Sequence, residues 1–267
     1  MAFLTAAVLW LVAAALAIPF FTRTWWLPEA ISEHARTVDG QFMLTLVVTG
    51  IIFILAQLAL GWAVFRYGGD RSGPAHYSHG NNTMELAWTT ATAILFIGLT
   101  VMGGSVWAKV HFQGAAPGAM QIEMTGQQFA WNVRYPGPDG KFGALDLKQI
   151  NDQGGNPLGV DSKDPAGKDD ITVPTMPVVV GREVELTLRT KDVTHAFFVP
   201  ELRLKQDTVP GLALKIHFTA EKKGRYELAC AELCGLGHYK MRSYLEVMDQ
   251  AEFDKWMQEK LAEKQQQ

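Results

Sequence analysis

The sequence predicts a transmembrane helical hairpin followed by an all-β domain of the sandwich or barrel type. Three observations predict this fold class. Most long apolar runs lie before residue 108, whereas most charged residues lie after it. Two of these runs are long enough to cross a bilayer as helices. The second half of the chain instead contains several short runs that alternate apolar and polar residues, with turn residues between them.

The apolar run at residues 2–21 leaves two alternatives open. It is long enough to be a membrane helix, although Pro19 interrupts its end. Ala15-Leu16-Ala17 resembles the cleavage site of a secretory signal, yet no Lys or Arg precedes the run. We therefore interpret residues 1–40 as a signal peptide or an extra helix, followed by a periplasmic lead into the hairpin.

Two further apolar segments, residues 42–65 and 86–106, predict the hairpin itself, which we place at residues 41–110. The first segment has Gln57 as its only strongly polar side chain, and the second has no charged residue. Buried helices of soluble proteins are rarely apolar on every side for such a length. Both segments therefore favour a membrane.

The polar connection at residues 68–85 orients the hairpin. Arg66 and Arg71 lie beside or within it, and positive charges near helix ends favour the cytoplasmic side. The second helix then runs outward, so that the chain after about Lys109 lies in the periplasm or its equivalent. Two arginines on the opposite side weaken this difference in charge.

Residues 111–249 contain the predicted strands of the all-β domain. The run 177–190 alternates on either side of Gly181-Arg182 in the manner of a hairpin. Residues 142–173 are rich in Gly, Asp, Lys and Pro and lack periodicity, which predicts a long surface insertion. We expect strands within residues 121–135, 177–190, 212–220 and 224–229.

The last residues, 250–267, are interpreted as an amphipathic helix and a tail. Phe253, Trp256 and Met257 recur at helical spacing among charged residues. They predict a helix over residues 250–261 with these three side chains on its apolar side.

Charge and cysteine content narrow the class of protein. A net charge of −3 argues against a nucleic-acid partner, which would favour a basic surface. The two cysteines, Cys230 and Cys234, cannot form a disulfide framework. One local disulfide, one metal site or one redox pair remain as alternatives.

One short segment near the C-terminus gathers metal ligands at close spacing. It places Cys230, Cys234, His238 and Met241 within twelve residues, and His195 lies upstream. Thiolates, imidazoles and a thioether form a soft ligand set. Such a set suits copper, with the thioether as a weak axial ligand, and does not suit magnesium or calcium.

The number of cysteines bears on the kind of site. One thiolate would serve a mononuclear blue-copper centre, whereas two allow a second copper because each sulfur can bridge both ions. Gly235 and Gly237 favour a tight loop around the metal. A disulfide between Cys230 and Cys234 is the structural alternative. Zinc is the rival metal, although the thioether of Met241 is a poor zinc ligand.

Three segments of the sequence carry a resemblance to one family. The cluster reads CAELCGLGHYKM, the segment that ends at the upstream histidine reads DVTH, and residues 204–211 read LKQDTVPG. Together they resemble cytochrome c oxidase subunit II, the CuA-containing subunit of haem–copper oxygen reductases. The resemblance runs from about Gln41 to Tyr244 and includes the two-helix hairpin.

The resemblance implies a cupredoxin-like fold for residues 111–249 and a binuclear copper centre, CuA, within it. Cys230 and Cys234 would bridge the two coppers, and His195 and His238 would each bind one. The full set of implied copper ligands is His195, Cys230, the backbone carbonyl of Glu232, Cys234, His238 and Met241.

The same resemblance implies roles beside the copper centre. The Glu232 side chain would bind a magnesium or manganese ion at the boundary with subunit I, because a carboxylate is a suitable ligand for such an ion. Asp192 and Asp207, which belong to the matching motifs, would support the site. The alternative for Glu232 is an ordinary loop carboxylate.

Glu85 has two interpretations, and one residue could serve both. It follows Asn82 by three residues at the start of the second membrane helix, a spacing that resembles a capping box. The family places a glutamate here at the mouth of a proton pathway that continues in subunit I. Ionisable groups near a membrane are costly enough to suggest a function.

The segment around Trp131 resembles the aromatic patch through which electrons enter. Phe129 and Ala130 depart from the commonest pattern of the family, in which aromatic residues, tryptophan among them, occupy these positions. Trp131 and Phe129 are the candidate entry residues. For Trp131 the alternative is packing in the core, because tryptophan is usually largely buried.

Three other histidines are not expected to bind the copper. His217 shares a strand face with Lys215 and Thr219, which predicts a surface position. His76 and His79 lie in the predicted cytoplasmic connection.

The function implied is that of an electron-transfer subunit of a respiratory terminal oxidase. The centre would accept electrons from cytochrome c, or an equivalent donor, and pass them to haem in subunit I. There oxygen is reduced to water with proton translocation, so no catalytic residue is expected in this chain. Subunits I and III would be partners in a bacterial-type inner membrane. The alternative is a membrane-anchored copper electron carrier outside an oxidase.

Overall fold

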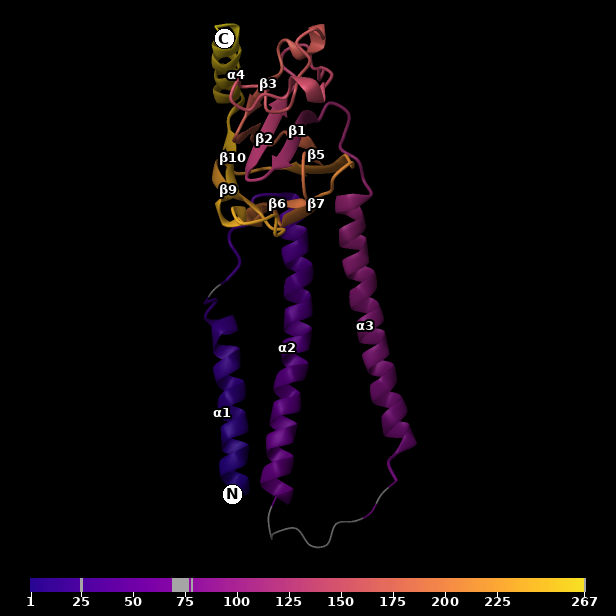
Figure 1. Cartoon of the computed structure of the whole chain (residues 1–267). Helices are drawn as coiled ribbons and strands as arrows, with labels where there is room; N and C mark the ends of the chain where they lie inside the picture. Colours follow the sequence, from indigo (N-terminus) through magenta and orange to yellow (C-terminus); the bar gives the residue numbers. More distant parts are fainter. Residues whose placement is uncertain (25, 69–76, 78, 267) are drawn as a thin grey trace. The chain divides into compact units, whose positions relative to one another are not determined.

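A computed structural model describes residues 1–24, 26–68, 77 and 79–266, which form two compact units. The first unit comprises Met1–Pro28 and Asp39–Trp107, and the second comprises Glu29–Val38 and Ala108–Gln267. Figure 1 labels their elements. The sequence-predicted divisions at residues 40, 110 and 249 stay predictions.

Three helices of the described chain are long and apolar enough to cross a membrane. The two predicted membrane segments lie inside two of them, α2 and α3. The run at residues 2–21 is also helical, which is compatible with both a signal peptide and a retained helix. The three helices are α1 (Ala2–Phe21), α2 (Glu33–Tyr67) and α3 (Asn82–His111).

The start of α3 differs from the prediction by one residue. Asn81, not Asn82, accepts hydrogen bonds at its Oδ1 from the N–H groups of Thr83 and Met84, both at 3.1 Å. Asn81 is therefore the N-cap, and the predicted capping box of Asn82 with Glu85 is wrong. Either of two adjacent asparagines could serve as the N-cap, and the sequence pattern does not show which one does.

Two five-stranded sheets form the second unit, which confirms the predicted all-β sandwich (Figure 1). The parallel pairs are β1 with β5 and β4 with β10, and the other neighbours are antiparallel. The first sheet has the order β3 (Ile171–Val173), β2 (Ala130–Tyr135), β1 (Met120–Gln127), β5 (Glu183–Thr190), β8 (Leu214–Thr219). The second has the order β4 (Met176–Val179), β10 (Arg242–Met248), β9 (Gly224–Cys230), β6 (His195–Val199), β7 (Leu204–Thr208).

The predicted hairpin at residues 177–190 is wrong, because its two arms belong to different sheets. β4 pairs with β10, whereas β5 lies between β1 and β8. Gly181, with a φ of 73°, lies in the turn that carries the chain from one sheet to the other. Alternation of residues indicates two strands and a turn but not which partners the strands choose.

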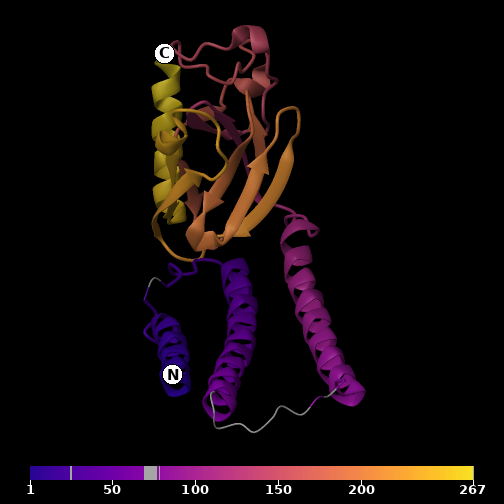
Figure 2. The same cartoon turned by 60° about the horizontal axis from the view of Figure 1, so that its bottom comes forward.

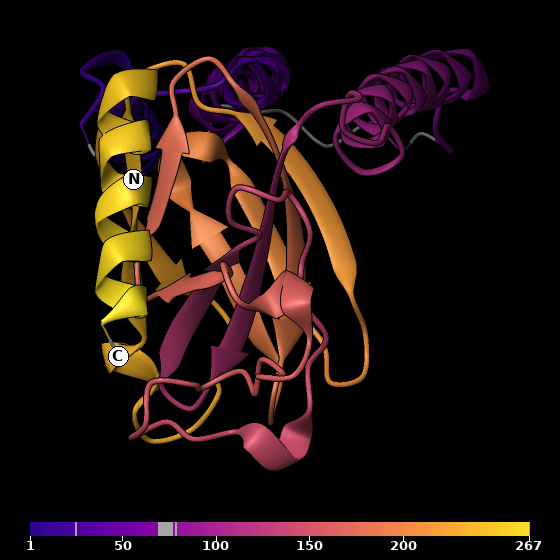
Figure 3. The same cartoon turned by 90° about the horizontal axis from the view of Figure 1, so that it is seen from above.

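The helix α4 (Gln250–Gln265) closes one side of the sandwich next to β3 and β4, which are edge strands of the two sheets (Figure 3). Phe253 is buried, and its ring and that of Trp256 pack against Tyr135 with centroids 6.2 and 5.1 Å away. The predicted apolar side of this helix is confirmed, and the helix extends four residues beyond the predicted residue 261.

The predicted insertion forms an irregular cap at one end of the sandwich (Figure 2). It contains two short 3-10 helices, Leu147–Gln149 and Pro165–Gly167, and ends as strand β3. The buried side chain of Arg134 anchors it, since its guanidinium pairs with the buried carboxylate of Asp170. The last three residues of the predicted insertion are thus part of the sheet.

His217 is buried, with 8% of its surface exposed, so its predicted surface position is wrong. The segment Glu29–Val38 covers this end of β8, and the ring of His34 contacts the ring of His217. Strand alternation places His217 on the outer face of its sheet but does not show what covers that face.

Candidate metal centre

The predicted ligands converge where three chain segments meet at one end of the second sheet. His195 begins β6 and Cys230 ends β9, and these two strands are neighbours in the sheet. The loop after Cys230 returns through a 3-10 turn, His238–Lys240, to β10. Sheet pairing therefore brings a histidine from one strand beside a loop that lies 35 residues further along the chain.

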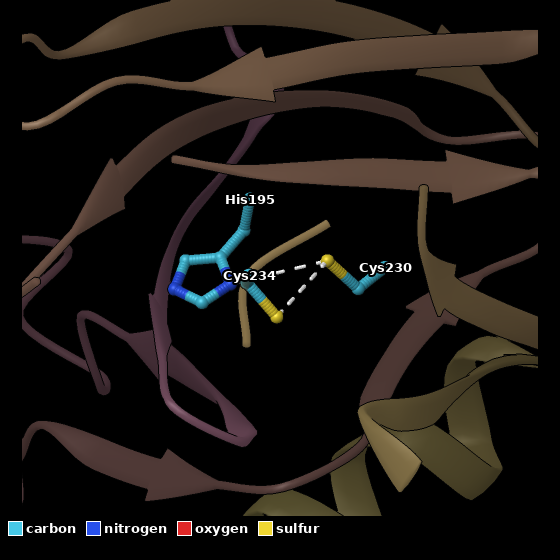
Figure 4. Close-up of side chains that lie close together, drawn as sticks. All are labelled: His195, Cys230 and Cys234. Carbon is cyan, nitrogen blue, oxygen red and sulfur yellow. Dashed lines mark hydrogen bonds between the residues drawn. The ribbon is translucent and has the colours of Figure 1, made fainter. Parts of the chain in front are cut away.

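Three buried side chains form the centre of this cluster (Figure 4). The ligand atoms of His195, Cys230 and Cys234 all lie within 4.8 Å of one another. Cys230 Sγ is 3.9 Å from His195 Nδ1 and 4.0 Å from Cys234 Sγ. A disulfide needs about 2.05 Å between its sulfurs, so the two cysteines are not joined in this structure.

The remaining predicted ligands surround the two sulfurs. Cys234 Sγ lies 3.5 Å from His238 Nδ1 and 3.8 Å from Met241 Sδ. Cys230 Sγ lies 3.2 Å from the backbone oxygen of Glu232. Each cysteine thus has its own histidine and one further donor atom.

These separations fit donors arranged around metal ions. Metal–sulfur and metal–imidazole bonds of about 2.3 and 2.0 Å, as known for zinc, place two donors of one ion about 3.5–4 Å apart. The thiolates, imidazoles and thioether provide the soft ligand set that copper prefers. The His195, Cys230 and Cys234 cluster is therefore compatible with copper.

The Cys234 thiol resists ionisation in its buried position. Burial, with a further contribution from the neighbouring Cys230, raises the pKa of Cys234 to about 11. Two adjacent thiolates are unfavourable in this setting unless a cation compensates their charge. Metal binding would supply that compensation.

Asp192 determines which nitrogen of His195 is free to bind a metal. Its Oδ1 lies 2.8 Å from His195 Nε2, so Nε2 carries the hydrogen and Nδ1 faces the sulfurs. Burial raises the pKa of Asp192, but hydrogen bonds from the Gln128 N–H and from His195 outweigh burial and lower it overall. The carboxylate is therefore ionised and able to orient the ring.

Gln128 is a part of the site that the sequence pattern did not reveal. Its backbone N–H donates to Asp192 Oδ2 at 2.7 Å, and its side-chain Nε2 donates to the carbonyl of Cys234 at 2.6 Å. It thus ties the turn between β1 and β2 to the cysteine loop. In the sequence, only its position beside the aromatic segment could have pointed to Gln128. An amide side chain at that position indicates no particular chemistry.

Gly126 is a second residue that sequence reasoning missed. A Cβ atom at this position would lie 2.8 Å from the His195 ring, which is closer than real Cβ contacts occur. The missing side chain makes room for the imidazole beside β1. The sequence contains many glycines, and the role of Gly126 follows only from the pairing of the strands.

The two candidate entry residues lie at different depths. Trp131 is 2% exposed, and its ring meets that of His195 edge to face at 5.9 Å between centroids. Phe129 is 37% exposed, and its ring covers Gly235 and Gly237 of the cysteine loop. Phe129 therefore connects the surface with the loop, whereas Trp131 packs behind the histidine.

Other predicted residues lie outside the cluster. The half-exposed carboxylate of Asp207 lies 3.9 Å from Lys205 Nζ, while its neighbour Thr208 donates to the backbone oxygen of His195 at 3.2 Å. Glu85 lies on α3 in the other unit. His79 contacts the ring of Tyr77, and His76 falls outside the described residues.

Comparison with known proteins identifies the family. Residues 120–248 match the model of the cytochrome c oxidase subunit II periplasmic domain. The alternative cytochrome c oxidase subunit 2 of Bradyrhizobium diazoefficiens is 31% identical over 90% of this chain and 85% of its own length. Cytochrome c oxidase subunit 2 of Synechocystis is 30% identical over 86% of this chain and 74% of its own.

The chain is also similar to a solved structure. The periplasmic domain of subunit II of cytochrome oxidase from Bradyrhizobium japonicum is 29% identical to this chain. The match spans 56% of this chain and 99% of the solved domain, with a TM-score of 0.41. From the family model and the two relatives together, the chain belongs to the cytochrome c oxidase subunit II family and is a subunit of that oxidase.

Proposed function

We propose that the β-domain holds a binuclear copper centre, which relays electrons from cytochrome c, or an equivalent donor, to haem in subunit I. The observation that carries the proposal is the division of the donors into two sets. Cys230 has His195 and the Glu232 carbonyl beside it, while Cys234 has His238 and Met241.

Two ions account for these donors better than one. The two histidines and two further donors lie next to different sulfurs, so a single ion would leave part of the set unused. Sulfurs 4.0 Å apart can both contact two ions lying between them. Copper bound in this way supplies one-electron transfer.

Hydrogen bonds with neighbouring residues support this arrangement. Asp192 holds the His195 ring, and Gln128 holds the loop at the Cys234 carbonyl. His195 is fully buried, and Cys230, Cys234 and Met241 are nearly so, which limits the approach of water. A rigid, dry ligand set has little to rearrange when its charge changes, and rapid electron transfer needs this property. Oxygen chemistry belongs to subunit I.

Phe129 and Trp131 are the proposed entry for electrons. Phe129 reaches the surface over the cysteine loop, and Trp131 touches the His195 ring. A donor that docks over Phe129 would thus come within a short path of the centre.

The apolar helices and the periplasmic-type domain fit a membrane protein whose C-terminal domain lies outside. We propose a multi-pass subunit of a bacterial-type inner membrane, bound to subunits I and III. Glu232 is the proposed ligand of a magnesium or manganese ion shared with subunit I. Glu85 is the proposed entry of a proton pathway.

The relay is tested in the assembled oxidase by rapid mixing with reduced cytochrome c. The copper absorption should change first and haem reduction should follow. In a Cys230→Ser oxidase, haem reduction should be lost. An unchanged rate of haem reduction in that variant would contradict the relay and favour another electron path.

Glu85→Ala tests the proton pathway in the same complex. Turnover should slow, while reduction of the copper centre keeps its rate, because only proton uptake is affected. If both rates are normal, Glu85 has no part in proton uptake.

A further inference from the structure

Two histidines outside the copper cluster meet in the unit that contains the β-domain. His217 lies on β8, and His34 lies in the first turn of α2, within the segment Glu29–Val38 of the same unit. Their rings meet edge to face with centroids 5.2 Å apart. His217 is buried and His34 is partly exposed, so the pair is within reach of solvent from one side.

A carboxylate fixes the tautomer of His217. Its Nδ1 lies 2.9 Å from Glu183 Oε1, and an ionised carboxylate only accepts hydrogen bonds, so Nδ1 carries the hydrogen. The Ala116 N–H donates to Glu183 Oε2 at 3.0 Å and holds the carboxylate in place. In the neutral ring, Nε2 is therefore left with a free lone pair.

That lone pair is buried. His217 Nε2 has no hydrogen-bond partner within the described part of the chain. Buried polar atoms in folded proteins nearly always have a partner, because an unpaired one loses its interaction with water without compensation. The atom is thus free to bind a ligand, and its ring packs against the ring of His34.

His34 is held in position by its own segment. Ile31 is buried in the core of the β-domain, its N–H donates to the Glu201 oxygen at 3.1 Å, and its oxygen accepts from the Glu221 N–H at 2.7 Å. The first turn of α2 is therefore fixed on the domain. His34 faces His217 from a preformed position.

The distance between the rings fits one shared ion. Two imidazoles bound to a tetrahedral ion through bonds of about 2 Å lie about 5 Å apart between centroids. A carboxylate on the far nitrogen of a ligating histidine is the usual outer partner of such a ligand. Nitrogen donors without a thiolate select a divalent ion of the zinc type and not a soft ion such as Cu(I).

We propose that His34 and His217 form a second metal site, which binds a divalent transition-metal ion of the zinc type, with Glu183 orienting His217. Water completes the coordination of the ion. When bound, the ion joins the first turn of α2 to strand β8 of the β-domain. The site lies on the first sheet and is independent of the copper ligands.

Zinc binding by the full-length chain in detergent tests this site. The native chain should bind one more Zn²⁺ than its His34→Gln variant, and the additional ion should show only nitrogen and oxygen neighbours in X-ray absorption. Zinc held by the copper cluster would show sulfur neighbours instead. The test therefore does not depend on whether the copper centre is binuclear.

Variants on different elements distinguish binding from misfolding. His34→Gln and His217→Gln should each weaken this zinc by at least about tenfold, and Glu183→Gln should weaken it by about 10–100-fold. Lys215→Gln, on the same strand with an exposed side chain, is the matched control and should leave zinc affinity unchanged.

Two results would overturn the site. One is equal zinc binding by the native and His34→Gln chains. The other is a loss of zinc in Lys215→Gln as large as in His217→Gln. Either would mean that the rings only pack against each other.

Discussion

Two buried histidines of the β-domain, one in each sheet, share the same local arrangement but face different surroundings. His195 on β6 pairs with Asp192 through Nε2, and His217 on β8 pairs with Glu183 through Nδ1. The free nitrogen of His195 faces two sulfurs, whereas His217 meets another imidazole.

The surrounding protein has two separate tasks at these histidines. The carboxylate selects which nitrogen is free, and it does so in a similar way at both sites. The groups beyond that nitrogen select the metal. Thiolates and a thioether favour copper at His195, and a second imidazole favours an ion of the zinc type at His217.

The largest effect is expected from Cys234→Ser, because it removes one of the two sulfurs between the proposed coppers. The chain should no longer hold two coppers that share one electron, while zinc bound at the His34 and His217 pair should be unaffected. Copper analysis and electron paramagnetic resonance measure the first effect. A variant that keeps the two-copper signal would show that the site assignment is wrong.

Asp192→Asn should have the next largest effect. The amide can donate to His195 Nε2, which favours a hydrogen on Nδ1 and blocks the nitrogen that faces the sulfurs. Copper affinity should fall about 10–100-fold in a competition titration with a chelator.

Glu183→Gln is the matched control for that change, since it alters the carboxylate of the other histidine. It should leave copper affinity unchanged. If both variants lose copper equally, the carboxylates act through general stability and not through their own histidines.

Gly126→Ala should destabilise the β-domain by about 1–3 kcal/mol, because the new methyl group would press on the His195 ring. A methyl group added at Gly114 would meet no other atom within 4 Å, so Gly114→Ala serves as the control. Thermal unfolding of both variants measures the difference. Equal stability of the two would show that the strand yields to the added methyl group.

Met241→Leu should have the smallest effect. Leucine has similar volume and polarity, so the fold should tolerate it. Two coppers should still bind, with a changed reduction potential and slower electron delivery to subunit I, because a thioether is a weak axial ligand that tunes potential. A redox titration that gives an unchanged potential would remove Met241 from the ligand set.

The residues that converge at the candidate metal centre could be selected from the sequence because most of them are close together in the chain, whereas their role as copper ligands stays a prediction. Five of them, including the Glu232 carbonyl, lie in the segment from Cys230 to Met241, and His195 was recognised from its own motif. The resemblance to a family then supplied the expected roles. Local spacing and soft-ligand chemistry were sufficient for these residues.

Residues whose role depends on pairing between distant segments could not be predicted in the same way. Gln128 and Gly126 gain their roles from strands and loops that are 64 to 106 residues away along the chain. His217 was assigned to the surface because the pattern of its strand could not show that the segment of His34 covers it. The strands that pair with β4 and β5 could not be predicted for the same reason.

Electron paramagnetic resonance of the full-length, copper-loaded chain, with copper analysis of the same sample, distinguishes a binuclear copper centre from a mononuclear one. A binuclear centre gives two coppers per chain and a hyperfine pattern from one unpaired electron shared equally by two copper nuclei, and we expect this result. One copper per chain, with the pattern of an electron on a single nucleus, would contradict the binuclear centre.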